Sequence, residues 1–144
     1  MATNANLNKQ PIGWVRQQVA MTADTTLVDT DSGTTYFLNS AAGAIAITLP
    51  TTLTAGVNYK FVVTENTPTA AITIAAGSAI MFGHIYEAEV DTSSDGPGSS
   101  AATGISNLII GTATEQGGWV LLETDGTSWY FHGGGAKDGS FTTS

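Results

Sequence analysis

Short segments with alternating apolar residues dominate this sequence, and turn-forming residues end each of them. From Ile45 to Leu49 and from Tyr59 to Val63, alternate positions carry large apolar side chains, which is the period of a strand with one buried face. No segment sustains the 3.6-residue period of an amphipathic helix. About eight to ten such segments, with turn residues roughly every 8–12 positions, are typical of a sandwich or a barrel. We therefore predict an all-β, jelly-roll-like antiparallel β-sandwich with an extended N-terminal arm.

The clearest turn is Asp125-Gly126, which separates the strand-like segments Trp119–Thr124 and Ser128–His132. Asp-Gly fits the two-residue turn of a β-hairpin, because glycine adopts positive φ without steric cost. Gly83 interrupts another strand-like run, where we expect a β-bulge or a close approach of backbones.

Three parts are expected from the distribution of polar residues and glycine. Residues 1–21 form a polar N-terminal arm, within which Trp14–Ala20 is either a docking element or the first edge strand of the body. Residues 22–132 form the β-sandwich domain. Residues 133–144 begin with three glycines and are expected to form a flexible tail.

Charge is scarce and unevenly distributed along the chain. Only 11% of the residues are charged, and the net charge is −8. Residues 1–23 contain two basic residues and no acid, whereas residues 24–144 contain all 12 acids and two lysines, a balance of −10. Because an acidic body repels phosphate groups, we expect no nucleic-acid partner and no anionic membrane. The polar N-terminus does not predict a signal peptide, and without cysteine the chain forms no disulfide.

Few residues suggest catalysis. His84 and His132 lie in separate strand-like segments and are expected to be isolated strand histidines. Glu87, Glu89 and Asp91 occupy every second position of one strand-like segment, so neighbouring carboxylates would lie about 6.6–7 Å apart. This distance falls within the range found for the two catalytic carboxyl groups of a glycosidase. Such a row is more typical of a solvated face or a charged sheet edge. We expect no enzyme, no catalytic residue and no cofactor.

The segment Asp91–Gly104 is expected to be an exposed loop, because it is rich in Ser, Gly and Asp. Its beginning, Asp91 to Gly96, places oxygen ligands at alternate positions, as a calcium loop does. Ala102 stands where the bidentate glutamate of such a loop belongs. We therefore expect no metal site, although the sequence leaves calcium at Asp91–Asp95 open.

Aromatic residues gather in the last two predicted strands, which contain Trp119, Trp129, Tyr130 and Phe131. Aromatic rings of this kind stack on sugars, but they more often fill cores and interfaces. Four large aromatic residues are candidates for either the core or a trimer interface: Tyr59, Phe61, Trp119 and Trp129.

Four segments, taken in order, resemble a known family: Asp31–Leu38, Ala41–Pro50, Gly56–Val63 and Gly118–Tyr130. The order resembles tailed-bacteriophage proteins described as capsid cement, head-decoration or head-fibre proteins. Related segments also occur in phage tail fibres. The similarity covers roughly residues 25–132, and it rests on a strand-and-turn pattern rather than on a catalytic signature.

The resemblance implies a structural virion protein on the outer capsid surface, with no active site. It implies a β-sandwich homotrimer at three-fold or quasi-three-fold positions, and an N-terminal arm that contacts the major capsid protein. In residues 1–21 we expect Lys9, Trp14 and Arg16 to lead this capsid contact. The alternative is a tail-fibre or adhesin module that binds host surface glycans.

Overall fold

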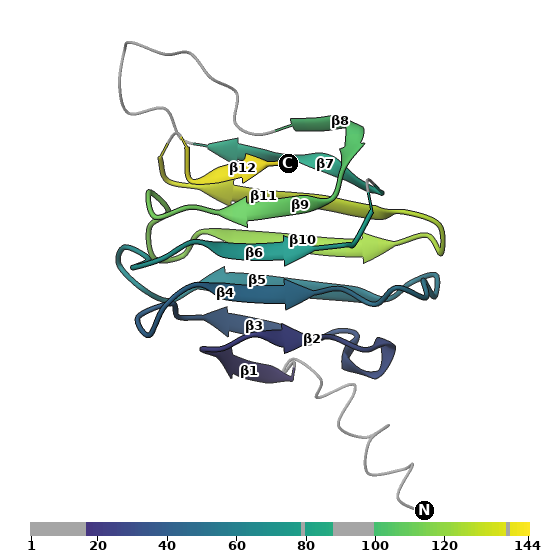
Figure 1. Ribbon diagram of the computed structural model, residues 1–144, viewed down its shortest axis with the longest axis horizontal. Helices are drawn as coiled ribbons and strands as arrows, with labels where there is room; N and C mark the ends of the chain where they lie inside the picture. Colours follow the sequence, from purple (N-terminus) through teal and green to yellow (C-terminus); the bar gives the residue numbers. More distant parts are fainter. Residues whose placement is uncertain (1–16, 79, 88–99, 138) are drawn as a thin grey trace, which may run out of the picture.

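The computed structural model describes residues 17–78, 80–87, 100–137 and 139–144. These residues form strands, turns and one 3₁₀ turn, η1 (Asp29–Asp31). The strands are β1 (Gln18–Met21), β2 (Thr25–Thr26), β3 (Thr35–Leu38), β4 (Ile45–Thr48), β5 (Asn58–Val63), β6 (Ile72–Ala75), β7 (Met81–Glu87), β8 (Ser100–Ile105), β9 (Asn107–Ile110), β10 (Trp119–Thr124), β11 (Trp129–Gly135) and β12 (Phe141–Thr143). They build two sheets that lie one in front of the other (Figure 1).

Both sheets are mixed. The seven-stranded sheet has the order β1-β3-β5-β10-β11-β7-β8, and the five-stranded sheet has the order β12-β9-β6-β4-β2. Of the ten pairings within the described ranges, five are parallel and five are antiparallel. The prediction of an all-β fold is confirmed. The prediction that its strands are antiparallel throughout is wrong, and the likeness to a jelly roll is not confirmed.

Four of the five parallel pairings arise because the chain alternates between the two sheets from β1 to β6. Odd-numbered strands join the seven-stranded sheet and even-numbered strands join the five-stranded one, so each strand lies beside the one two elements earlier. Parallel neighbours need a crossover instead of a tight hairpin, and the strand in the opposite sheet is part of that crossover. The β10–β11 hairpin then lies between β5 and β7 (Figure 1).

The core follows the alternation that the sequence predicts. Four isoleucines of β4 and β6 are buried in register with one another: Ile45, Ile47, Ile72 and Ile74. Their neighbours in the core include large aromatic rings from the seven-stranded sheet, among them Tyr59 and Trp129, whose ring centroids lie 5.7 Å apart. Burial of apolar surface is the main favourable contribution to folding, so this layer holds the sheets together.

The C-terminal segment is part of the fold, and the expectation of a flexible tail at 133–144 is wrong. Strand β11 extends to Gly135, and Phe141 in β12 is buried. The glycines serve close packing here. A Cβ at Gly133 would lie 2.2 Å from the carbonyl oxygen of Trp119, so no larger residue fits beside β10.

Two other predicted boundaries also change. Residues 18–21, placed within the predicted arm, form the edge strand β1 beside β3. For the described residues 18–20, the structure therefore favours the edge-strand alternative over a docking element. Residues 100–104, expected in the exposed loop, belong to β8, which pairs with β7. Backbone pairing determines both boundaries, because polar and small residues lengthen a strand when a neighbour satisfies their N–H and C=O groups.

The predicted hairpin and the predicted bulge are confirmed. Strands β10 and β11 form an antiparallel hairpin, and Gly126 in its turn has a φ of +95°. The loop has four residues, Asp125 to Ser128, instead of the two predicted, because Thr124 pairs with Trp129. At Gly83 the β7–β8 register shifts, and a Cβ there would lie 1.9 Å from the carbonyl oxygen of Phe131. Gly83 is therefore both a bulge position and a site of close backbone approach.

Candidate functional site

The outer surface of the seven-stranded sheet gathers most of the exposed aromatic side chains that the structure describes. We call it the aromatic face and define it by its outward residues on β5, β10, β11 and β7: Lys60, Val62, Trp119, Leu121, Glu123, Tyr130, His132, Phe82, His84 and Tyr86. Register places these residues in rows across the sheet. One row runs Val62, Trp119, Gly134, Tyr86, and the next runs Lys60, Leu121, His132, His84.

Rings of the aromatic face contact one another both across neighbouring strands and along one strand. Tyr130 lies beside Phe82 with ring centroids 6.2 Å apart, and His84 meets Tyr86 edge-on at 4.9 Å. Tyr86 is 68% exposed and Tyr130 is 43% exposed, which is high for side chains of this size. Clustered exposed aromatic side chains are a feature that protein interaction surfaces commonly share.

Among the residues that define the aromatic face, only Lys60 and Glu123 carry a full charge. The Lys60 Nζ lies 5.4 Å from the ring centroid of Trp119, which is a cation–π distance. Glu123 lies in the same sheet, one strand away on β10 and opposite Asn58. The face is thus close to neutral, although the chain as a whole is acidic.

A fixed negative charge borders the aromatic face at the β10–β11 turn. Hydrogen bonds from the Thr127 hydroxyl and from the backbone amides of Thr127 and Ser128 hold the pKa of Asp125 well below its usual range. The Tyr130 hydroxyl donates to the other carboxylate oxygen of Asp125 at 3.1 Å. This hydrogen bond to a carboxylate raises the pKa of Tyr130.

The structure separates the four aromatic residues that the sequence left between core and interface. Tyr59, Phe61 and Trp129 are fully buried and belong to the core. Trp119 is half-buried and lies on the aromatic face, where its ring meets His132 edge-on at 6.0 Å. The sequence alone missed Tyr86 and Phe82 as site residues. The signal was available in the sequence, because Phe82 and Tyr86 alternate with the apolar residues Met81 and Ile85. When Met81 and Ile85 are buried, this alternation places Phe82 and Tyr86 on the outward side of β7.

The two histidines are not isolated, and that expectation is corrected. His84 on β7 and His132 on β11 are register partners in adjacent parallel strands. Both point to the aromatic face and both are exposed. They are 48 positions apart in the chain, so only the parallel pairing of β7 with β11 brings them together.

The predicted carboxylate row is only partly described. Glu87 accepts hydrogen bonds from the backbone amides of Phe141, at 2.7 Å, and Gly139, at 3.2 Å. It therefore links the seven-stranded sheet to β12 in the other sheet. Glu89, Asp91 and the candidate calcium residues Asp91–Asp95 lie outside the described residues, as do Lys9, Trp14 and Arg16. Within the described ranges no three His, Asp or Glu side chains gather as a metal site would require.

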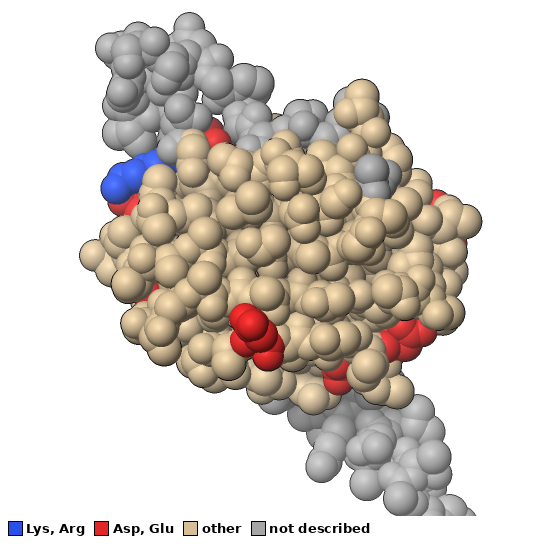
Figure 2. Space-filling model, in the orientation of Figure 1, with Lys and Arg blue, Asp and Glu red and all other residues tan. Residues whose placement is uncertain are grey.

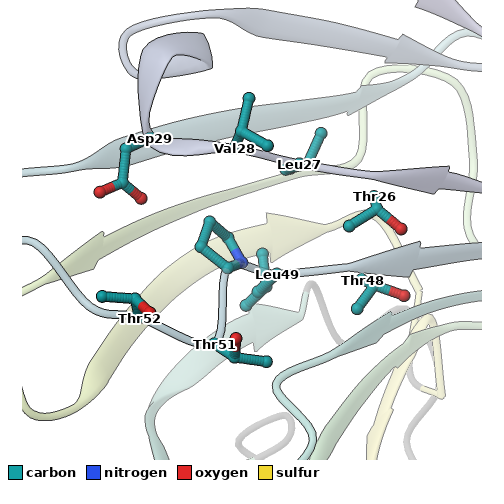
Figure 3. A pocket seen from close by; sticks show the side chains of 9 residues that line it. Thr26, Leu27, Val28, Asp29, Thr48, Leu49, Thr51 and Thr52 are labelled. Atoms are coloured by element: carbon teal, nitrogen blue, oxygen red, sulfur yellow. The ribbon is translucent and has the colours of Figure 1, made fainter.

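A shallow hollow of about 380 Å³ lies at the ends of β2 and β4 (Figure 3). Threonines and apolar side chains line most of it, and Asp29 supplies its one carboxylate. That carboxylate already accepts a hydrogen bond from the Thr54 hydroxyl. The hollow therefore offers contact surface and no convergent set of reactive groups.

The opposite side of the molecule, formed by the five-stranded sheet, has a different chemistry. Its outward residues include Ala46, Thr48 and Thr142, all exposed. Figure 2 shows a broad surface with few charged side chains on this side. Threonine and alanine make it flatter and less aromatic than the aromatic face.

No helix of the described residues has the length and apolar character needed to cross a membrane. No protein-family model matches the chain, and no curated protein matches it.

Proposed function

We propose that this protein is a structural virion component, a cement protein that decorates and stabilises the outer surface of a phage capsid. In this proposal it acts as a homotrimer at three-fold or quasi-three-fold positions, with the major capsid protein as its partner. It has no enzymatic role. The aromatic face forms contacts between copies, and residues 1–17, the part of the predicted arm that precedes β1, provide the contact to the shell.

The observation that carries the proposal is the aromatic face. It combines exposed rings, such as Tyr86 and Tyr130, with only two full charges. Interfaces are enriched in Tyr, Trp and Phe and depleted of charge at their centre. Lys60 and Glu123 have opposite signs, so neighbouring copies can pair them instead of repelling each other.

The segments that resemble phage decoration proteins support the same proposal, because they lie together in space. Three of them supply β3, β5 and the β10–β11 hairpin, which are consecutive in the seven-stranded sheet. The fourth supplies β4 in the opposite sheet. Three of the four segments therefore lie side by side in one sheet, and together they carry six of the ten residues that define the aromatic face.

Physical chemistry explains how such a protein strengthens a shell. A protein that binds the assembled lattice more tightly than its free subunits shifts the equilibrium towards assembly. Three linked contacts per trimer raise avidity by about 10²–10⁴-fold when all three engage. Each single contact between arm and shell can then remain modest.

Co-sedimentation with expanded, undecorated capsids of the same phage tests the proposal. We expect saturable binding in multiples of three copies per site. Deletion of residues 1–13 is expected to lower the number of bound copies while the far-UV circular dichroism of the protein stays unchanged. Absence of bound copies with the full chain would refute the cement function. Unchanged occupancy after the deletion would refute the role of the arm.

A glycan-binding function, as in a tail-fibre or adhesin module, is the second candidate. The exposed rings of Tyr86 and Tyr130 favour it, because flat aromatic rings stack on sugars. A glycan array probed with the full chain distinguishes the two functions. Specific binding that is lost in a Tyr86→Ala variant, together with no capsid binding, would establish the second candidate in place of the first.

A further inference from the structure

The two histidines of the chain form a matched pair on the aromatic face. His84 and His132 occupy the same register position in adjacent parallel strands. Neighbouring strands lie about 4.7–4.9 Å apart, and side chains at the same register position point to the same side of the sheet. The two imidazoles therefore leave the sheet side by side, and both are exposed.

This arrangement suits one ion held by two nitrogens. A zinc–imidazole bond is about 2.0–2.1 Å long, so two imidazole nitrogens on a tetrahedral ion are about 3.3 Å apart. Rings that start from neighbouring strands reach this separation by side-chain rotation alone. Imidazole is a preferred ligand of Zn²⁺, Cu²⁺ and Ni²⁺, whereas Mg²⁺ and Ca²⁺ prefer oxygen.

We propose that His84 and His132 form a bidentate site for a divalent transition-metal ion of the Zn²⁺, Ni²⁺ or Cu²⁺ type. In the single chain the remaining coordination positions face solvent and are open to water. The site is independent of the proposed attachment to a capsid, since it rests on the register of β7 and β11.

The surroundings of the pair permit a cation. The histidines have ring contacts only with Tyr86 and Trp119 among the described residues, and these contacts are edge-on. Tyr86 is largely exposed, so His84 can rotate away from it. The nearest full positive charge in the same row, Lys60, is separated from His132 by Leu121 on the strand between them. The net charge of −8 attracts cations to the molecule as a whole.

Isothermal titration of the full chain without a histidine tag tests the site, with Ni²⁺ and Zn²⁺ as the probes. We expect one ion per chain, and tighter binding of Cu²⁺ than of Ni²⁺ or Zn²⁺ in a parallel titration. His84→Gln and His132→Gln are each expected to weaken binding at least about tenfold, since even the loss of an outer-sphere partner has that effect. The double variant is expected to bind more weakly than either single variant, because it lacks both imidazole nitrogens, whereas each single variant keeps one.

A Tyr86→Phe variant is the matched control, because it keeps the ring beside His84 and removes only the hydroxyl. Quenching of Trp119 fluorescence by Cu²⁺ gives a second readout, and Trp119→Phe is expected to remove it.

The titration is repeated on the Val62→Glu variant, which is designed to disrupt contacts between copies. If the wild type binds no ion but this variant does, the histidine pair is buried in the trimer and the site exists. Two independent ions per chain, unchanged binding in the double variant, or no binding in either background would refute the proposal.

Discussion

At the scale of single residues, glycines serve two separate physical roles in this fold. Gly133 lies in β11, where a Cβ would meet the carbonyl oxygen of Trp119 at 2.2 Å and the backbone of Val120 at 3.0 Å. Gly77 has a φ of +76°, and a Cβ at that position would meet no other atom within 4 Å. Position 133 has no room for a Cβ atom, whereas position 77 has room for one but requires a positive φ, which glycine adopts easily.

Substitution of these glycines separates the two effects. We expect Gly133→Ala to lower the free energy of unfolding by about 3 kcal/mol or more, because backbone atoms block the new methyl group. Gly77→Ala is expected to cost only about 1–2 kcal/mol, the cost of a left-handed residue. Urea denaturation of both variants measures this. Equal losses would contradict the packing role of Gly133.

Tyr59 gives a prediction on pH. Its buried hydroxyl donates to the carbonyl oxygen of Val28 at 2.9 Å, and burial, followed by the charges of Asp29 and Asp31, raises its pKa. Because the pKa is raised in the folded state, the folded protein holds the Tyr59 proton more tightly than the unfolded chain does. The stabilisation of the folded state by this protonated hydroxyl is complete below the unfolded pKa of about 10, and it is lost as the pH rises above that value. The protein is therefore expected to lose stability in alkaline solution.

A Tyr59→Phe variant tests this assignment. It is expected to lose about 1 kcal/mol at pH 8, the value of one hydrogen bond. Between about pH 10 and 11 its stability is expected to fall less steeply than that of the wild type. Urea denaturation at pH 8 and across about pH 10 to 11 measures the stability of each protein, and Tyr86→Phe, which alters an exposed tyrosine, serves as the control. Parallel pH profiles for the wild type and Tyr59→Phe would rule out Tyr59 as the source.

At the scale of elements, β12 joins the two sheets. It pairs with β9 in the five-stranded sheet, while Glu87 at the end of β7 accepts hydrogen bonds from the amides of Gly139 and Phe141. The buried hydroxyl of Thr114 also donates to the carbonyl oxygen of Ser140 at 2.6 Å. Strand β12 is therefore attached by side chains from outside its own sheet.

The attachment of β12 predicts a large effect at its buried position. Phe141→Ala is expected to lower the free energy of unfolding by about 3–5 kcal/mol, the usual cost of removing a buried phenylalanine side chain. Thr142→Ala, at the next and exposed position, is the control and is expected to change it by less than about 0.5 kcal/mol. Thermal denaturation followed by circular dichroism compares them. A small effect of Phe141→Ala would mean that β12 contributes little.

At the scale of the whole molecule, the fold presents two broad faces of different character. The chain winds between the sheets from β1 to β6, and the β10–β11 hairpin widens the seven-stranded sheet. This insertion places Trp119 and Tyr130 between β5 and β7, and so creates the centre of the aromatic face. The five-stranded sheet presents threonine and alanine instead.

The difference between the faces predicts which one holds copies together. We expect sedimentation equilibrium to give three times the chain mass of 14.8 kDa. Val62→Glu, on the aromatic face, is expected to shift the protein to the monomer, because an unpaired charge in an interface is costly. Thr48→Glu, on the opposite face, is expected to leave the trimer intact. A trimer that survives Val62→Glu but not Thr48→Glu would assign the interface to the other sheet.

The sequence by itself determined the local features of this protein. Alternation of apolar residues identified most of the strands and their buried positions, though not β8 or β12, and Asp125-Gly126 identified the hairpin. Both signals depend only on neighbours in the chain. The tertiary structure decided the strand directions, the place of residues 133–144, and which of Tyr59 and Trp119 faces solvent. It also brought His84 and His132 together. These features depend on pairing between strands that are distant in sequence, and a local pattern carries no information about which strand becomes the neighbour.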